Sequence, residues 1–111
     1  MTEPVKILIV EDNPRDAEFL EQLIKSWDVP CQFDRAHNGL VALKMALDSD
    51  QPLVISDIQM PEMNGIEFAR NLWQRKPQAR IVFWSQFKDE MYVRTLSRIV
   101  PPETVYGYLL K

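Results

Sequence analysis

The chain has 111 residues, of which 46% are hydrophobic and 26% charged, and its net charge is −3. These values are typical of one globular domain and leave too little chain for two ordinary domains. Acidic and basic residues are mixed rather than grouped in blocks, so we expect no nucleic-acid contact through this segment. Cys31 is the single cysteine, which excludes an internal disulfide and argues against a zinc cluster.

Hydrophobic runs in this sequence are short. The run Val5–Val10 cannot supply the core of a signal peptide, and no segment approaches the roughly 20 apolar residues of a membrane-spanning helix. We therefore expect no membrane association and a cytoplasmic location.

The first half of the chain predicts two strands, each followed by a helix. The apolar run Val5–Val10 suits a strand buried on both faces, and the weaker run Cys31–Ala36 suits an edge strand. Asn13 is suited to cap a helix that begins at Pro14, where the missing N–H costs nothing. Apolar residues then recur at helical spacing in two stretches: Phe19, Leu20, Leu23, Ile24 and Trp27, and, after Asn38-Gly39, Leu40, Leu43 and Leu47.

The second half continues the alternation. The runs Leu53–Ser56, Ile81–Trp84 and Val105–Leu110 predict three more strands. Helical spacing appears in two stretches: Ile66, Phe68, Ala69, Leu72 and Trp73 after Asn64-Gly65, and Tyr92, Val93, Leu96, Ile99 and Val100 before Pro101-Pro102. Such alternation predicts a doubly wound α/β fold, with a five-stranded parallel sheet, right-handed crossovers and helices on both faces.

Polar side chains follow four of the predicted strands. They are Glu11 and Asp12, then Asp57, Ser85 and Lys111. In an open parallel sheet, ligands bind beyond the carboxyl ends of the strands, where the strand order reverses. We therefore expect these five side chains to converge at one edge of the sheet.

The three acids in this group predict a cation site. Carboxylates about 5 Å apart repel by roughly 3 kcal/mol per pair at an effective dielectric near 20, so they must protonate, separate or bind a cation. Mg²⁺ suits them because it accepts one or two carboxylates and keeps water and room for a phosphate oxygen. Taken singly, Asp12 or Asp57 can be explained as a helix cap or a turn residue. Their occurrence together with Ser85 and Lys111 favours a functional site.

The residues around Asp57 carry a family resemblance. Residues 56–65, Ser-Asp-Ile-Gln-Met-Pro-Glu-Met-Asn-Gly, resemble the phosphoacceptor motif of response-regulator receiver domains. Glu11-Asp12, Ser85 and the ending Tyr-Leu-Leu-Lys111 match the other signatures of the family, in the family's order. The resemblance implies one receiver domain over residues 1–111, a flavodoxin-like sheet of order 2-1-3-4-5, and a role in two-component signal transduction.

The resemblance implies a phosphorylation switch rather than an enzyme. Asp57 corresponds to the nucleophile that attacks the phosphohistidine of a histidine kinase or phosphotransfer protein. Asp12 and Asp57 correspond to ligands of Mg²⁺, with Mn²⁺ as an alternative ion. Glu11 is expected to act through water, and Gln59 to contribute its backbone carbonyl.

The resemblance also assigns the residues that respond to the phosphoryl group. Lys111 would pair with its oxygens and Ser85 would donate a hydrogen bond to one of them. If Ser85 moves to do so, Tyr108 corresponds to the aromatic residue that turns inward, and phosphorylation biases an existing equilibrium. The resemblance leaves a homodimer open, and a partner or output domain, such as one that controls transcription, would receive the signal.

Two features depart from the family pattern. Gln86 stands where a small residue is common, and with Phe87 it is expected to restrict access to the acyl phosphate, so we expect slow autodephosphorylation. The family continues past the lysine with a proline and a final helix, whereas this chain stops at Lys111. Either the sequence is a piece of a longer protein, or a hydrophobic face beside the first helix is bare and invites association. We favour truncation before the last helix, with any output domain absent.

Three alternatives remain on the residues alone. A phosphatase similar to haloacid dehalogenases would need an Asp-x-Asp pattern after the first strand, which Glu11-Asp12-Asn13-Pro14 does not supply. A flavodoxin-like flavin binder would need a phosphate-binding loop there rather than two acids. A degenerate receiver that binds partners without phosphorylation is disfavoured by the intact acids, although Gln86 keeps it open.

Overall fold

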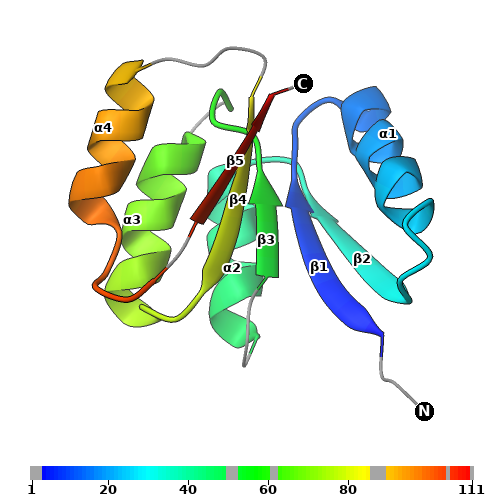
Figure 1. The fold of residues 1–111 in the computed structure, drawn as a ribbon, viewed down its shortest axis with the longest axis horizontal. Helices are drawn as coiled ribbons and strands as arrows, with labels where there is room; N and C mark the ends of the chain where they lie inside the picture. The colour runs from blue at the N-terminus through cyan, green and yellow to red at the C-terminus, as the bar shows by residue number, and fades with distance from the viewer. Residues whose placement is uncertain (1–3, 50–52, 61–62, 86–89, 105, 111) are drawn as a thin grey trace.

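The computed structural model describes residues 4–49, 53–60, 63–85, 90–104 and 106–110. In these ranges strands and helices alternate along the chain (Figure 1). The strands are β1 (Val5–Val10), β2 (Cys31–Ala36), β3 (Leu53–Ser56), β4 (Arg80–Ser85) and β5 (Tyr106–Leu110). The helices are α1 (Pro14–Lys25), α2 (Gly39–Asp48), α3 (Gly65–Arg75) and α4 (Glu90–Ile99). The predicted bounds of β1, β2 and β3 are confirmed, whereas β4 is one residue longer at each end than the apolar run.

The strands form one parallel sheet in the order β2-β1-β3-β4-β5, as expected. From β1 the chain moves outward to β2, and then returns across β1 to continue with β3, β4 and β5. The strand order therefore reverses between β1 and β3. All carboxyl ends point to the same edge of the sheet, at the top of Figure 1. Parallel α/β sheets bind ligands at this kind of reversal.

The sheet divides the core into two layers. Helices α2, α3 and α4 cover one face, and α1 covers part of the other (Figure 1). The larger layer is built around Phe68 and Leu72 of α3, Phe83 of β4 and Leu96 of α4, each fully buried. Burial of side chains of this size stabilises the fold by about 1.5–3 kcal/mol each.

Helix α2 packs differently from the expectation that Leu40, Leu43 and Leu47 form its core stripe. Leu40 is exposed, and the buried residues of the helix are Gly39, Ala42 and Ala46. Small side chains on this face allow α2 to lie close to its neighbours, so the leucine stripe runs along the side of the helix.

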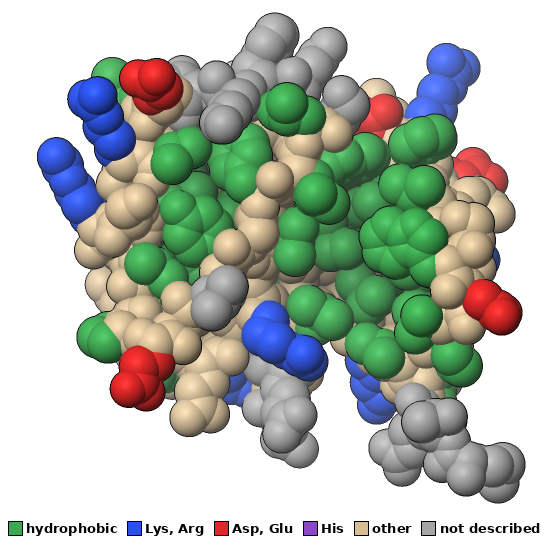
Figure 2. Space-filling view, in the orientation of Figure 1, with side chains coloured by type: hydrophobic (Ala, Val, Ile, Leu, Met, Phe, Trp, Pro, Cys, Tyr) green, Lys and Arg blue, Asp and Glu red, His purple; other side chains and the backbone are tan. Residues whose placement is uncertain are grey.

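Helix α1 also buries only part of its apolar stripe. Leu20 and Ile24 are buried, whereas Phe19 is 62% exposed and Trp27, just past the helix, is 57% exposed. Leu109 of β5 is exposed as well. Figure 2 shows hydrophobic side chains gathered over this side of the molecule, from the strands across to α1. In the described ranges, α1 is the one helix that packs on this side of the sheet.

Asparagine begins three of the helices. Asn13 accepts a hydrogen bond from the backbone N–H of Arg15, and Asn38 accepts one from that of Val41, each at 2.9 Å. Asn64 accepts from two N–H groups, those of Ile66 and Glu67, at 3.0 and 2.9 Å. These caps satisfy N–H groups that a helix start leaves unpaired. All three follow strand carboxyl ends, so they also fix the loops at the edge where the acids lie.

None of the helices within the described ranges has the length and apolar character that crossing a membrane requires.

Candidate metal and phosphoacceptor site

The site begins where β1 and β3 end side by side. Val10 pairs with Ser56 in the sheet, so Glu11 and Asp57 are the next residues on the two strands. The backbone N–H of Asp57 donates to the carbonyl oxygen of Val10 at 2.9 Å, and that of Glu11 donates to Ala36 at 3.0 Å. Both acids therefore continue the sheet hydrogen bonding directly, and their backbone positions are set by the sheet.

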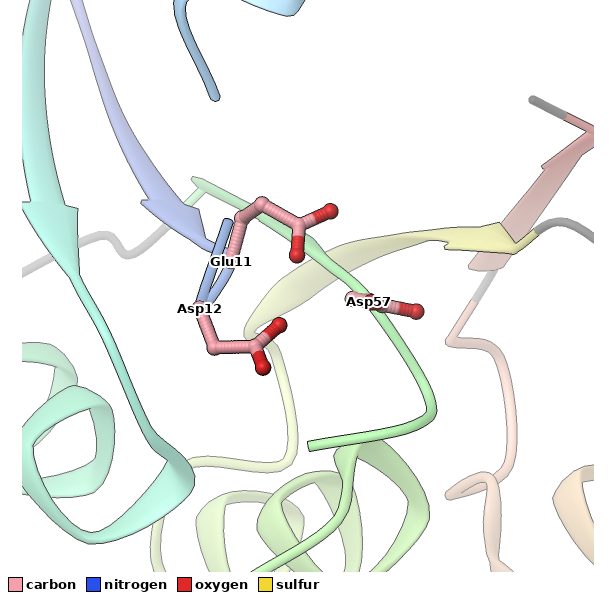
Figure 3. A group of neighbouring side chains, drawn as sticks. All are labelled: Glu11, Asp12 and Asp57. Atoms are coloured by element: carbon pink, nitrogen blue, oxygen red, sulfur yellow. The ribbon is translucent and has the colours of Figure 1, made fainter. Parts of the chain in front are cut away.

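Glu11, Asp12 and Asp57 form one carboxylate cluster. One oxygen from each lies within 4.8 Å of the others. Figure 3 shows Glu11 and Asp12 on the loop after β1, with their side chains extending toward the strand end that carries Asp57. Glu11 and Asp57 are only 6% and 7% exposed, whereas Asp12 is exposed. The predicted convergence of these acids is confirmed, and solvent reaches the cluster on the side of Asp12.

The spacing of the cluster fits a small divalent cation. Oxygens bound to one Mg²⁺ at about 2.1 Å are about 3 Å apart at right angles and about 4.2 Å apart when opposite. A limit of 4.8 Å therefore allows two carboxylates to bind the ion directly with small adjustments, and a third to act through water. The donor set contains oxygen alone, which suits a hard cation rather than zinc or copper.

Hydrogen bonds hold both the backbone and the side chain of Asp57. Its backbone N–H donates to Val10, its backbone carbonyl accepts from the hydroxyl of Ser56 at 2.8 Å, and its Oδ1 accepts from the N–H of Gln59 at 3.2 Å. Glu11 is oriented by a backbone donor, since Asn13 N–H lies 3.3 Å from its Oε2. The predicted contribution of the Gln59 carbonyl to a metal stays a prediction.

Ser85 and Tyr108 lie in the part of the sheet next to Asp57. Ser85 ends β4, which adjoins β3, and its side chain is buried. Tyr108 pairs with Phe83 across β4 and β5 and is half-buried against the larger core layer. The structure thus places Ser85 beside the acceptor strand, with Tyr108 on the next strand.

Three predicted site residues, Lys111, Gln86 and Phe87, lie outside the described residues. Conversely, the structure reveals two neighbours of Asp57 to which the sequence assigned no role. Ser56 contacts its carbonyl oxygen, and Gly65 packs on its backbone. Two sequence features could have pointed to them: Ser56 is a hydroxyl residue at the end of an otherwise apolar run, and Gly65 directly follows a helix cap.

Comparison with known proteins decides the family. The model described as response regulator receiver domain matches residues 7–101. The chain belongs to this family. The assignment confirms the resemblance carried by residues 56–65 and separates this receiver domain from the phosphatase and flavin-binding alternatives.

Curated relatives place the receiver domain in longer proteins. It is 32% identical to the nitrate/nitrite response regulator protein NarL of Escherichia coli, over 98% of this chain and 49% of that protein. It is 40% identical to hybrid signal transduction histidine kinase G of Dictyostelium discoideum, over 59% of this chain and 2% of that protein. The chain thus spans about half or less of the length of these relatives.

Solved structures agree on the fold. The response regulator protein TrrA from Thermotoga maritima, in complex with Mg²⁺-BeF, is 30% identical and has a TM-score of 0.79, with 96% of this chain and 86% of that chain covered. The chemotaxis protein CheY4 of Vibrio cholerae has a TM-score of 0.82 at 20% identity, with 98% and 88% covered. The second likeness concerns the fold alone.

Proposed function

We propose that this receiver domain is a Mg²⁺-dependent phosphorylation switch whose phosphoacceptor is Asp57. The observation that carries the proposal is the cluster of Glu11, Asp12 and Asp57, in which a buried carboxylate lies next to two others at the reversal point of a parallel sheet. Three carboxylates at this spacing repel one another, and a bound divalent cation would offset that repulsion.

The reaction is a transfer of the phosphoryl group to an oxygen of Asp57. The P–N bond of a phosphohistidine breaks, the O–P bond of an aspartyl phosphate forms, and the imidazole leaves with the electron pair. Asp57 suits this step because its carboxylate is buried and is already oriented by the hydrogen bond from Gln59 N–H. Orientation of this kind removes much of the entropic cost of bringing two reactants together.

Asp12 and Asp57 would hold Mg²⁺ directly, Glu11 would act through water, and the backbone carbonyl of Gln59 would be a further ligand. When bound, the ion would supply positive charge that offsets the charge of the incoming phosphoryl group beside the carboxylates. The exposed side of the cluster, at Asp12, provides the route by which a donor approaches.

Ser85 and Lys111 stabilise the phosphoryl oxygens, the first as a hydroxyl donor and the second as a cation. Phosphorylation adds about −1.5 to −2 charge and three acceptor oxygens. A shift of Ser85 toward them opens space near Tyr108, and the inward rotation of Tyr108 carries the signal to the β4–β5 face. Gln86 and Phe87 slow the loss of the phosphoryl group.

The partners follow from the family. A histidine kinase or phosphotransfer protein supplies the phosphoryl group, and a partner or output domain reads the switch in the cytoplasm. The relatives support this, since they include hybrid signal transduction histidine kinases and the response regulator NarL.

The test is the intact mass of the protein after incubation with a small phosphodonor, such as acetyl phosphate, in the presence of Mg²⁺. We expect a gain of one phosphoryl group in the wild type, no gain in Asp57→Asn, and no gain when the metal is removed by a chelator. Asp34→Asn, which alters an exposed acid on β2, should behave like the wild type. A wild type that binds Mg²⁺ without gaining mass would instead be a degenerate receiver that acts through partner binding alone.

A further inference from the structure

The strand residue before the acceptor is a buried serine. Ser56 has no exposed surface, and it follows Val54 and Ile55 in a run that is otherwise apolar. Its hydroxyl donates to the backbone carbonyl oxygen of Asp57 at 2.8 Å. A valine or leucine would bury more apolar surface in this position, so the hydroxyl replaces hydrophobic burial with one specific contact to the acceptor residue.

Hydrogen bonds at its N–H and at its carbonyl oxygen fix the backbone of Asp57. The N–H of Asp57 is bound to Val10 in β1, and its carbonyl oxygen is bound to Ser56. With both ends of the residue held, its two backbone dihedrals have little freedom, and these dihedrals set the direction of the Cα–Cβ bond. The hydrogen bond from Gln59 N–H to Oδ1 then limits rotation of the carboxylate itself.

The carbonyl of Asp57 also lies close to Gly65. A β-carbon added to Gly65 would lie 2.9 Å from the α-carbon of Ile58 and closer still to the carbonyl oxygen of Asp57. Gly65 N–H donates to Ile58 at 2.8 Å, which keeps the start of α3 against this backbone. The carbonyl oxygen of Asp57 thus has both the Ser56 hydroxyl and Gly65 as close neighbours.

We propose that Ser56 is a positioning residue for the Asp57 carboxylate. Among the described hydrogen bonds of Asp57, the one from Ser56 comes from a side chain, so a substitution can remove it without changing the sheet. The expected effect of Ser56 on the rate of phosphorylation rests on the proposed function, because a displaced carboxylate loses its alignment with the phosphodonor. Its effect on metal binding is independent of phosphorylation, since the same carboxylate belongs to the acidic cluster.

The experiment compares Ser56→Ala and Ser56→Cys with the wild type, with Ser56→Thr as the variant that keeps the hydroxyl. Val54→Ala is the matched control, because Val54 is fully buried two residues earlier on the same strand face and its apolar side chain has no hydroxyl to donate to Asp57. Two quantities are measured on folded protein: the dissociation constant for Mg²⁺ by titration calorimetry, and the maximal rate of phosphorylation by acetyl phosphate.

We expect Ser56→Ala and Ser56→Cys to lower the maximal rate about tenfold and to weaken Mg²⁺ binding about threefold or more, while Ser56→Thr stays within about twofold of the wild type. Val54→Ala should lower stability but leave both quantities unchanged. Wild-type rate and Mg²⁺ affinity in Ser56→Ala would overturn the inference and leave the proposed function standing. If the wild type binds Mg²⁺ but gains no phosphoryl group, the proposed function fails, and the Mg²⁺ affinities of the variants still decide the role of Ser56.

Discussion

Gly65, the first residue of α3, packs directly on the backbone of Asp57. Its N–H donates to Ile58 at 2.8 Å, and its missing side chain leaves the room that the Asp57 carbonyl occupies. No glycine in the described residues has a positive φ, so the need for glycine here is steric rather than conformational. The acceptor strand and the start of α3 are therefore joined by backbone packing.

We predict that Gly65→Ala lowers the free energy of unfolding by about 2 kcal/mol or more, because a β-carbon would displace rigid backbone rather than a flexible side chain. Urea denaturation followed by circular dichroism measures the change. Gly107→Ala is the matched control. Its β-carbon would lie 3.3 Å from a methyl carbon of Val82, a side chain that can adjust, so its cost should stay below about 1 kcal/mol. Equal costs for the two variants would contradict the steric explanation.

The acidic cluster predicts that Mg²⁺ stabilises the fold. At a free concentration one hundred times its dissociation constant, a ligand of the native state adds about 2.7 kcal/mol to the free energy of unfolding. In Asp12→Asn this gain should fall by more than half, since a direct ligand is lost. Without metal, the same variant should equal or exceed the wild type in stability by up to about 1 kcal/mol, because one source of repulsion is removed.

Urea denaturation in a chelator and in excess Mg²⁺ tests both expectations. Asp34→Asn removes an exposed carboxylate from β2 and should retain the full gain from the metal. If Mg²⁺ stabilises Asp12→Asn as much as the wild type, the ion does not bind at this cluster.

The convergence of the acids could be predicted from sequence because it needs only two facts. Val5–Val10 and Leu53–Ser56 each read as buried strands, and an acid follows each one directly. In a parallel sheet the carboxyl ends meet at one edge, so the acids must approach one another wherever the strands are neighbours. This convergence does not depend on the exact register that pairs Val10 with Ser56.

Burial along the helices was harder to predict. The spacing of Phe19, Leu23 and Trp27 matches a helix face, yet these side chains are exposed, because spacing identifies a stripe and not what covers it. In α2 the buried face consists of Gly39, Ala42 and Ala46, whose small side chains carry little hydrophobic signal. Contacts that depend on interatomic distance, such as Ser56 with Asp57, leave almost no trace in the sequence pattern.

Tyr106 and Tyr108 lie two residues apart on β5, and both pack against the larger core layer. Tyr106 joins Trp73 and Phe83 in a group of three rings, with centroid distances of 6.4 Å to Trp73 and 6.0 Å to Phe83. Trp73 is fixed in turn by an edge contact with Phe83 and by the hydrogen bond from its Nε1 to the carbonyl oxygen of Ala79 at 2.9 Å. Aromatic pairs of this geometry contribute about 0.5–1.5 kcal/mol each beyond their burial, so Tyr106 is held firmly.

We predict that phosphorylation, or its mimic beryllofluoride with Mg²⁺, changes the surroundings of Tyr108 and leaves those of Tyr106 unchanged. Tyr108 is half-buried and lies two residues further along β5, where its strand approaches the level of Ser85. Fluorotyrosine incorporated throughout the protein gives a separate ¹⁹F NMR signal for each tyrosine, and Tyr106→Phe and Tyr108→Phe assign them. The Tyr108 signal should shift on addition of beryllofluoride with Mg²⁺, and Asp57→Asn should abolish the shift. A Tyr108 signal that stays in place while the acceptor is occupied would show that this side chain does not report the switch.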